Sequence, residues 1–405
     1  MTMQTALTVI FWSCFAVIAW VYFGYPAALR CNVFGTPCAK REGKPKNKEL
    51  FCPEVSVIVA AHNEECGIET KLRNLIESDY PRHRMEILVG SDGSSDRTEE
   101  IVSLFRDQGV GLLSFPRQRG KSAIQNGLVA AASGSVLVFT DADCLLPRDA
   151  ISCLVQRLGD PGVGLVTGAP RYRNAGETST TANEGLYLRY ETWLRSLESD
   201  RGLLAVASGS LFAIRRSLWQ ALEPNHGDDF ALPLHVAGTR MRSVLERRAC
   251  PITDLAQSTP KAMLGLKVRV ISKDFRALLH KRGLLNPARH PRLALALWSH
   301  KLLRWLVPYF LLALFAANIF LLNRIFFRVA MSLQVAFYSV ASGGLLMRRG
   351  HRGRLLALPA SFCLVNCAAI VGTLKCLRGG ASGVWKPERV GAEKPGSRRK
   401  QVPAG

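Results

Sequence analysis

The feature that most constrains this chain is an uncharged apolar run near its start. Residues 6–28 read ALTVIFWSCFAVIAWVYFGYPAA, about the length that a helix needs to cross a bilayer. The basic residues come after the run rather than before it: Lys40, Arg41, Lys44, Lys46 and Lys48. This order favours a membrane span that ends in the cytoplasm over a signal peptide. We expect a transmembrane helix over residues 1–30 and a basic linker over residues 31–50.

Three more apolar runs lie near the other end, at residues 302–322, about 328–346, and 355–374. We expect about three transmembrane helices within residues 301–376 and a basic, disordered tail over residues 377–405. The chain has eight Lys or Arg from Lys375 onward, and four crossings would place them outside, against the positive-inside rule. The sequence predicts a multi-pass protein of the cell (inner) membrane and leaves the number of spans open.

The excess of positive charge says little about nucleic acid. The formal net charge is +22 at pH 7, but much of it flanks apolar runs, as at Arg348, Arg349, Arg352 and Arg354. No helix-turn-helix, zinc finger or aromatic-interleaved basic stretch accompanies it, so we expect no nucleic-acid partner. The eleven cysteines contain no CxxC pair, which indicates neither a disulfide framework nor a zinc site.

Between the membrane segments, residues 51–265 alternate short β-branched runs with helical patterns. The strands expected from these runs are VSVIVAA (55–61), EILVG (86–90), GLLSF (111–115) and VLVFT (136–140). Between the first two lies a helix with Ile68, Leu72, Leu75 and Ile76 on one face. This alternation predicts an α/β fold in which helices flank a sheet.

Acidic and amide residues follow three of these strands, at Asn63 and Glu64, at Asp92, and at Asp141 and Asp143. Ligands of open α/β sheets bind beyond the carboxyl ends of the strands, so these ends predict a polar site. Asp141 and Asp143 can point to one side and would repel each other without a cation. Mg²⁺ or Mn²⁺ there would complete its shell with water and substrate phosphate. Alone, the Asp-Ala-Asp triplet is equally typical of a turn.

Six motifs in this order resemble those of the inverting family 2 glycosyltransferases over about residues 53–285. They are PEVSVIVAAHNEE, SDGSSD, RGKSAIQNGL, FTDAD, SGSLFAIRRSLW and GDDFALPLHV. The resemblance implies a GT-A type, Rossmann-like mixed sheet flanked by helices. It implies a nucleotide-sugar donor, with a uridine nucleotide as the first expectation, and a hexosyl- or N-acetylhexosaminyl-transferase activity.

The resemblance also implies roles for single residues. The base and ribose would be held by Ala61, Asn63, Glu64 and Asp92, with Lys121 nearby. Asp143 would bind the metal with help from Asp141, Ser208 and Gly209 would line the acceptor side, and Asp229 would be the general base. Displacement at an anomeric carbon does need a base for the acceptor hydroxyl and a cation for the departing diphosphate. Asp228 beside Asp229 would raise the basicity of the pair if the two come close. Both residues could also cap the helix that follows.

Two departures from the family stand out. Ser91 replaces the first acid of the second-strand motif, and the QxxRW motif of processive members is absent. In its place stands KVRVISKDFRALLHKRG (267–283), where Arg269, Lys273 and Arg276 could neutralise the leaving diphosphate. An amphipathic helix on an anionic membrane surface, within an interfacial segment at residues 266–300, explains the pattern at least as well. His280, His290 and His300 are expected at the surface or the interface.

We therefore expect an inverting, metal-dependent transferase that acts on a membrane-proximal acceptor, such as a lipid-linked or growing surface polysaccharide. Two alternatives stay open: a processive polysaccharide synthase that also exports its product, and a non-catalytic, nucleotide-sugar-binding membrane scaffold. The sugar, the linkage and the oligomeric state are not specified by the sequence.

Overall fold

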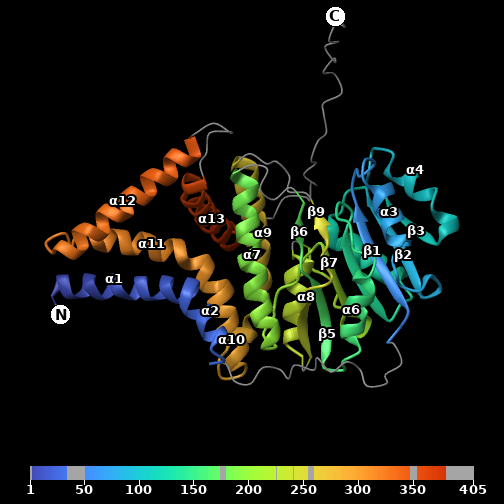
Figure 1. Cartoon of the computed structure of the whole chain (residues 1–405), viewed down its shortest axis with the longest axis horizontal. Coiled ribbons are helices and arrows are strands. Elements are labelled where there is room, and N and C mark those ends of the chain that lie inside the picture. The colour runs from blue at the N-terminus through green and yellow to red at the C-terminus, as the bar shows by residue number, and fades with distance from the viewer. Residues whose placement is uncertain are drawn as a thin grey trace, which may run out of the picture.

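The computed structural model describes residues 2–33, 51–173, 179–224, 226–239, 241–253, 260–346 and 354–379. Figure 1 shows a domain built on a β-sheet and a group of long helices that extends away from it. Most of the expected basic linker, and the tail from residue 380 on, lie outside the described residues.

The sheet has seven strands in the order β3-β2-β1-β4-β7-β5-β8. Their bounds are β1 Val55–Ala61, β2 Met85–Asp92, β3 Val110–Phe115, β4 Val136–Asp141, β5 Val163–Gly168, β7 Leu211–Arg215 and β8 Arg242–Glu246. Strands β1 to β4 pair in parallel, whereas β7 runs antiparallel to both β4 and β5. A separate pair joins β6 (Arg171–Tyr172) to β9 (Ile252–Thr253). The mixed, helix-flanked sheet confirms the predicted fold class.

Helices cover both faces of the sheet because its strands alternate apolar side chains between the two faces. Val57 and Val59 pack with one set of helices, whereas Ile58 packs with the other. The first set is α3 (Ile68–Ile76), α4 (Thr98–Ser103) and α6 (Ala150–Leu158), and the second is α5 (Lys121–Ala131) and α8 (Asp228–Ala237). Short 3₁₀ turns occupy Arg82–Arg84, Arg106–Gln108, Arg216–Leu218 and Arg282–Leu285.

Four segments are long and apolar enough to cross a membrane: Met3–Arg30, Pro291–Ile319, Ile325–Leu345 and Leu358–Leu377. The first joins α1 (Met3–Ala19), the π-helical turn η1 (Trp20–Gly24) and α2 (Tyr25–Arg30). The second joins α10 (Pro291–Leu297), the π-helical turn η6 (Trp298–Leu302) and α11 (Leu303–Ile319). The two π-helical turns meet, and the indole Nε1 of Trp20 donates to Ser299 Oγ at 2.9 Å. The remaining helices are α12 (Ile325–Leu346) and α13 (Arg354–Leu377).

Two further helices, α7 (Ser179–Asp200) and α9 (Pro260–His280), lie between the sheet and the apolar helices (Figure 1). Ile271, Phe275 and Leu278 of α9 are buried in a core shared with α8, α11 and α13. The expectation that this face of the segment rests on lipid is therefore wrong for these three residues. Their helical spacing reflects packing within the protein.

His300 corrects a second expectation, because it is buried and not at the surface. Its Nε2 lies 3.0 Å from Glu191 Oε1 and its Nδ1 lies 2.8 Å from Glu198 Oε1. Tyr25 donates to Glu198 at 2.7 Å, and Arg304 Nη1 lies 2.9 Å from Glu191. Although burial alone would raise it, the charges of His300 and Arg304 hold the pKa of Glu191 well below its usual value. This network ties α7 to two apolar helices.

Candidate active site

The parallel strands bring their polar ends to one edge of the sheet. Ala60 of β1 pairs with Asp141 of β4, and Ala61 pairs with Ser91 of β2. The residues after these strands that were predicted to bind a ligand are thus neighbours, as expected at the carboxyl ends of parallel strands. We call this edge, with Asp92, Asp141 and Asp143, the donor edge.

The loops after β1 and β2 hold each other in place. Asn63 has a φ of 57°, in the left-handed region that Asn tolerates better than most residues. Its Oδ1 accepts the backbone N–H of Ser95 at 2.7 Å, and the N–H of Glu64 donates to Thr98 Oγ1 at 2.7 Å. Asn63 and Glu64 are half-buried at the mouth of the edge, whereas Ala61 is buried.

Asp92 anchors the loop that carries Lys121. Its fully buried carboxylate accepts the backbone N–H groups of Arg119, at 2.5 Å, and Gly120, at 2.9 Å. Gly120 has a φ of +90°, a conformation that L side chains rarely adopt, so glycine is needed where the loop turns into α5. Ser91, which stands where the family has an acid, bonds to Ser94 through its hydroxyl at 3.0 Å.

Lys121 joins the donor edge to the start of α8. Its Nζ lies 2.8 Å from Asp141 Oδ1 and 3.2 Å from Asp228 Oδ2, and Gln125 donates to the same Asp228 oxygen at 2.6 Å. Although burial lowers it, the charges of Asp141 and Asp228 raise the pKa of Lys121 well above its usual value. Burial would raise the pKa of Asp228, but Lys121 and Gln125 bring it below normal. Asp228 is thereby held as a carboxylate.

Asp229 faces the same space without such an ion pair. A methyl group placed on Gly209 would lie 3.8 Å from Asp229 Oδ2, 3.8 Å from Lys121 Nζ and 3.9 Å from Asp141 Oδ2. These three groups therefore converge on Gly209. Burial and the charge of Asp228 raise the pKa of Asp229, which makes it the stronger base of the two. Ser208, beside Gly209, is held by Thr167 Oγ1, which accepts its N–H at 2.8 Å.

The donor edge suits a divalent cation. Desolvation by the surrounding protein and the charge of Asp141 raise the pKa of Asp143, although the residue is partly exposed to solvent. A cation between the two carboxylates would relieve this repulsion. Within the described ranges no cluster of three or more His, Cys, Asp or Glu could hold a metal. Two carboxylates with water and diphosphate oxygens are a usual set for Mg²⁺.

Sequence reasoning missed Lys71, which lies directly behind the Asp141–Asp143 turn. Its side chain is completely buried, and its Nζ donates to Thr140 Oγ1 at 2.8 Å and to the carbonyl of Cys144 at 2.7 Å. Its charge also opposes the rise in the pKa of Asp143. A signal was present, because position 71 falls three residues after Ile68, on the apolar face of α3.

The three cations predicted on α9 separate into two groups. Burial and the charge of Arg269 lower the pKa of Lys273, whereas Asp228 and Asp229 act in the opposite direction. Lys273 thus lies near the carboxylates of α8, and Arg269 lies near Lys273. Arg276 instead acts on His226, whose pKa is lowered by burial and by His280 and Arg276.

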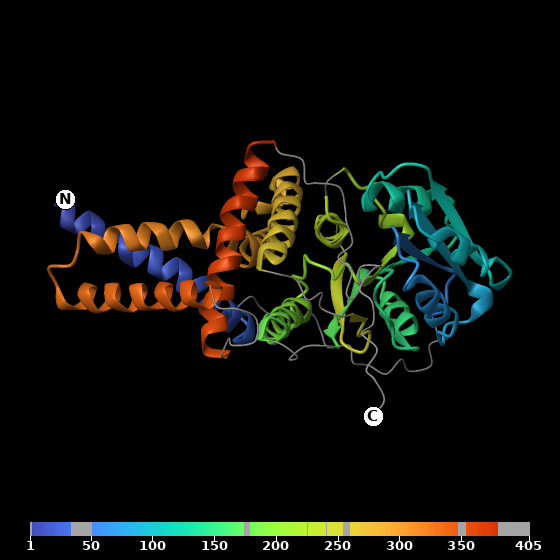
Figure 2. The same ribbon diagram turned by 90° about the horizontal axis from the view of Figure 1, so that it is seen from above.

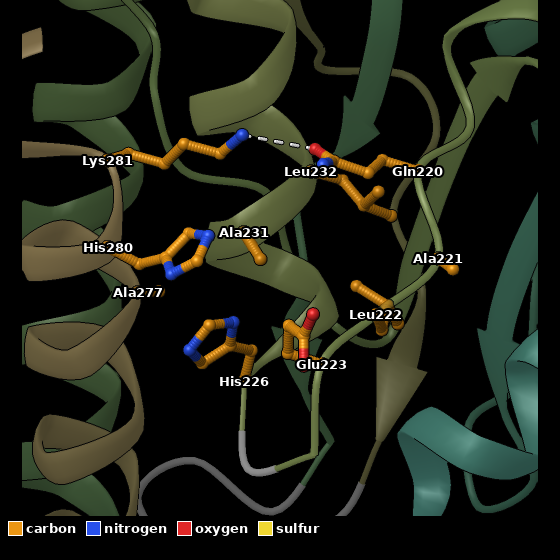
Figure 3. Close-up of a pocket in the computed structure, with 10 residues that line it drawn as sticks. All are labelled: Gln220, Ala221, Leu222, Glu223, His226, Ala231, Leu232, Ala277, His280 and Lys281. Carbon is orange, nitrogen blue, oxygen red and sulfur yellow. Dashed lines mark hydrogen bonds between the residues drawn. The ribbon is translucent and has the colours of Figure 1, made fainter. Parts of the chain in front are cut away.

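His226 and His280 lie next to each other in an edge-to-face contact on one side of a small pocket between α8 and α9 (Figure 3). Their rings lie 5.6 Å apart, and at the mouth Lys281 donates to Gln220 at 3.2 Å. None of the predicted site carboxylates lines this pocket. The reaction is therefore expected at Gly209 and not here.

Three residues that face Asp229 from the membrane helices and their neighbours were also missed. Asp274 of α9 is buried, and its Oδ1 would lie 3.6 Å from a methyl group on Gly227, which Asp229 Oδ1 would approach at 2.7 Å. Burial and Asp229 raise the pKa of Asp274 to about 7. The positive charges of Arg195 (α7) and Lys301 (η6) act on both acids. We call Asp229, Asp274, Arg195 and Lys301 the membrane edge.

Comparisons with known proteins agree with this geometry. Residues 56–222 match the family described as Glycosyl transferase family 2. The probable glycosyltransferase YdaM of Bacillus subtilis (strain 168) is 35% identical over 186 residues, 43% of each chain. An N-acetylglucosaminyltransferase of Rhizobium meliloti (strain 1021) is 31% identical over 180 residues, 42% of this chain and 41% of the relative. The matches span less than half the length of these relatives.

Among solved structures, the mannosyltransferase PcManGT from Pyrobaculum calidifontis, in complex with GDP-Man and Mn²⁺, has the same fold. Its TM-score is 0.67 at 21% identity, and the match covers 92% of this chain and 99% of that one. This likeness shows that the chain has a GT-A type fold. Residues 56–222 are a family 2 glycosyltransferase domain, as the motifs predicted.

Proposed function

We propose that this protein transfers a sugar from a nucleoside-diphosphate sugar to a membrane-proximal acceptor, with inversion at the anomeric carbon. The observation that carries the proposal is the convergence of Asp141, Lys121 and Asp229 on Gly209. Asp141, a proposed metal ligand, and Asp229, the proposed base, border one small space, which suits a donor sugar between its diphosphate and the acceptor.

Asp229 is the general base of the proposed reaction. As the acceptor oxygen bonds to the anomeric carbon, its proton passes to Asp229. The bond from that carbon to the diphosphate oxygen breaks with its electron pair staying on the diphosphate. The raised pKa of Asp229 favours this proton transfer, and Asp228, held by Lys121 and Gln125, keeps its charge beside it.

The diphosphate would leave from the donor edge. A divalent cation held by Asp143 and Asp141 would neutralise part of its charge. Lys121 and, from α9, Lys273 supply further positive charge near the carboxylates, and Arg269 lies near Lys273. Gly120 allows the backbone to approach the phosphates closely, and Asp92 keeps that loop in position. Asn63, Glu64 and Asp92 border the space proposed for the nucleoside.

The acceptor is proposed to be a lipid-linked saccharide or a growing surface polysaccharide, reached from the cytoplasmic side of the cell membrane. Lys301, whose charge acts on Asp229, belongs to the apolar segment Pro291–Ile319. A residue of a candidate membrane span thus lies beside the base, which suits an acceptor held at the bilayer. Ser208 and Gly209 would line the path to it.

Diphosphate release from purified protein in detergent tests the proposal. Uridine and guanosine diphosphate sugars are screened with and without Mn²⁺, using wild type, Asp143→Asn and Asp229→Asn. Wild type is expected to release diphosphate only with metal, and both variants are expected to lose this activity. Wild-type turnover in both variants would show that these roles are wrongly assigned. Nucleotide binding without turnover for every donor and acceptor would favour a binding scaffold.

A further inference from the structure

Helix α13 meets the length and hydropathy expected of a membrane span, yet it is placed differently from the other three. Figure 2 shows α1, α11 and α12 extending side by side away from the catalytic domain, whereas α13 runs across their base, beside α9. The chain returns to the catalytic side at the end of α12, before α13 begins (Figure 1). Composition alone therefore does not establish a fourth crossing.

The contact between α13 and α9 is close. A methyl group on Gly372 would lie 3.0 Å from Ile271 Cγ2 and 3.1 Å from the carbonyl oxygen of Val268. Ala368, Ala369 and Cys376 of α13 belong to the same buried core as Phe275 of α9 and Phe230 of α8. The small residues on this face of α13 let the two helices approach, so both must lie at the same depth.

That depth is fixed by α9, which carries charge along the stretch that α13 covers. Within ten residues it has Lys267, Arg269, Lys273, Asp274 and Arg276. Charged side chains are strongly disfavoured at the centre of a bilayer. Asp274 and Lys273 also face the catalytic carboxylates. Helix α9 therefore belongs outside the hydrocarbon layer, and so does α13.

The other face of α13 is apolar and exposed. Cys367, Val371 and Leu374 follow each other at i, i+4 and i+7, and Val371 is 48% exposed. Lys375 and Arg378 follow, and long basic side chains can extend to lipid headgroups. The face of α13 opposite this stripe packs on α9, so the helix can lie in the plane of the membrane surface with the stripe toward lipid and the basic residues at its end toward anionic headgroups. The stripe adjoins the helices that extend into the proposed bilayer.

We propose that α13 is an interfacial helix on the leaflet that faces the catalytic domain, and that the described chain crosses the membrane three times. The crossings are Met3–Arg30, Pro291–Ile319 and Ile325–Leu345. The inference rests on the proposed membrane location of the protein. It places Arg348, Arg349, Arg352 and the basic residues after Lys375 on the cytoplasmic side, which removes the conflict with the positive-inside rule.

Protease access to the full-length protein in a bacterial host tests this topology. A protease site with an epitope is placed after Gly405, after Asn323 in the turn between α11 and α12, or within residues 34–50. The protease is added to spheroplasts or to inverted membrane vesicles. The site after Gly405 and that within residues 34–50 are expected to be cut only in inverted vesicles. The site after Asn323 is expected to be cut only in spheroplasts.

A tail site that is cut in spheroplasts, or that resists cleavage in inverted vesicles while the site within residues 34–50 is cut, overturns the proposal. Diphosphate release is measured in the same vesicles, so a failure of topology is distinguished from a failure of the proposed enzyme. Carbonate extraction of the tagged protein would instead contradict its membrane location, on which the inference rests.

Discussion

The donor edge and the membrane edge are built in different ways. The donor edge comes from strand ends and the turns that follow them, all within residues 55–143, and the register of parallel strands brings them together. The membrane edge is assembled from α7, α8, α9 and η6, which are separated by up to about a hundred residues. The comparison teaches that sheet topology places the carboxylates proposed for metal and donor binding, whereas the proposed base is placed by the packing of the domain on its apolar helices.

The sharpest separation of the two edges is expected from Asp229→Asn and Asp143→Asn. Loss of a general base costs about 10²- to 10⁴-fold in rate, so Asp229→Asn should lower kcat by that amount. Metal-dependent nucleotide binding, measured by calorimetry, should stay unchanged in Asp229→Asn and be lost in Asp143→Asn. Loss of nucleotide binding in both variants would mean that the edges do not act separately.

The packing of α7 on the apolar helices, which positions the membrane edge, can be tested through stability with His300→Leu. This change leaves Glu191 and Glu198 buried without their shared partner. Breaking a buried ion pair costs about 3 to 5 kcal/mol, so thermal unfolding in detergent should occur at a clearly lower temperature. The control is His83→Leu, because His83 is exposed. An equal Tm for the two variants would contradict a structural role for the network.

In the donor edge, Lys71 has a comparable structural role, because its buried amine bonds to both sides of the Asp141–Asp143 turn. Lys71→Met should misplace the Asp141–Asp143 turn, since it removes the bonds to Thr140 and Cys144. Groups that orient metal ligands typically contribute about 10- to 100-fold to metal affinity. We expect the Mn²⁺ concentration for half-maximal activity to rise by that factor, with kcat at saturating Mn²⁺ much less affected. Lys261→Met, at an exposed position, is the control.

The smallest effect is expected from Asp274→Asn and concerns pH. Because burial and Asp229 raise the pKa of Asp274 to about 7, Asp274 gains its charge between about pH 6 and 8. That charge makes Asp229 more basic, so wild-type kcat/KM should rise through this range, and the rise should be absent in Asp274→Asn. If the pH dependence of kcat/KM is the same in wild type and Asp274→Asn, the charge of Asp274 does not influence Asp229.

Stability should respond to the same group in a defined direction. The folded-state pKa of Asp274 lies above the usual value for a carboxyl, so the protonated acid is favoured by folding. Ionisation of Asp274 therefore lowers the free energy of unfolding. This loss of stability is absent at pH values below the unfolded pKa of about 4, grows as pH rises, and is complete above about pH 7. Asp274→Asn should therefore raise Tm at pH 8 more than at pH 5.

The sheet and the donor edge could be predicted because the signals for them lie close together in the sequence. Alternating apolar residues give strands such as Val55–Ala61, and the acids after them mark the ends where ligands bind. Of the membrane edge only Asp229 was named from the sequence, because the positions of Arg195, Asp274 and Lys301 depend on helix packing across long separations. For the same reason the sequence could not predict what covers the apolar face of α9. An amphipathic pattern is compatible with contact to lipid or to protein, and in the structure this face packs on α8 and α13.

The π-helical turn η6 affects how residues of an apolar helix are oriented toward the candidate active site. A π turn accommodates one extra residue, and each residue turns a helix by about 100°. Without that residue, the side chains on one side of η6 would be rotated by this angle relative to those on the other. His300 and Lys301 would then lose their orientation toward Glu191 and Asp229. The π turn therefore sets how the apolar helix that carries Lys301 is rotated relative to the carboxylates of the site.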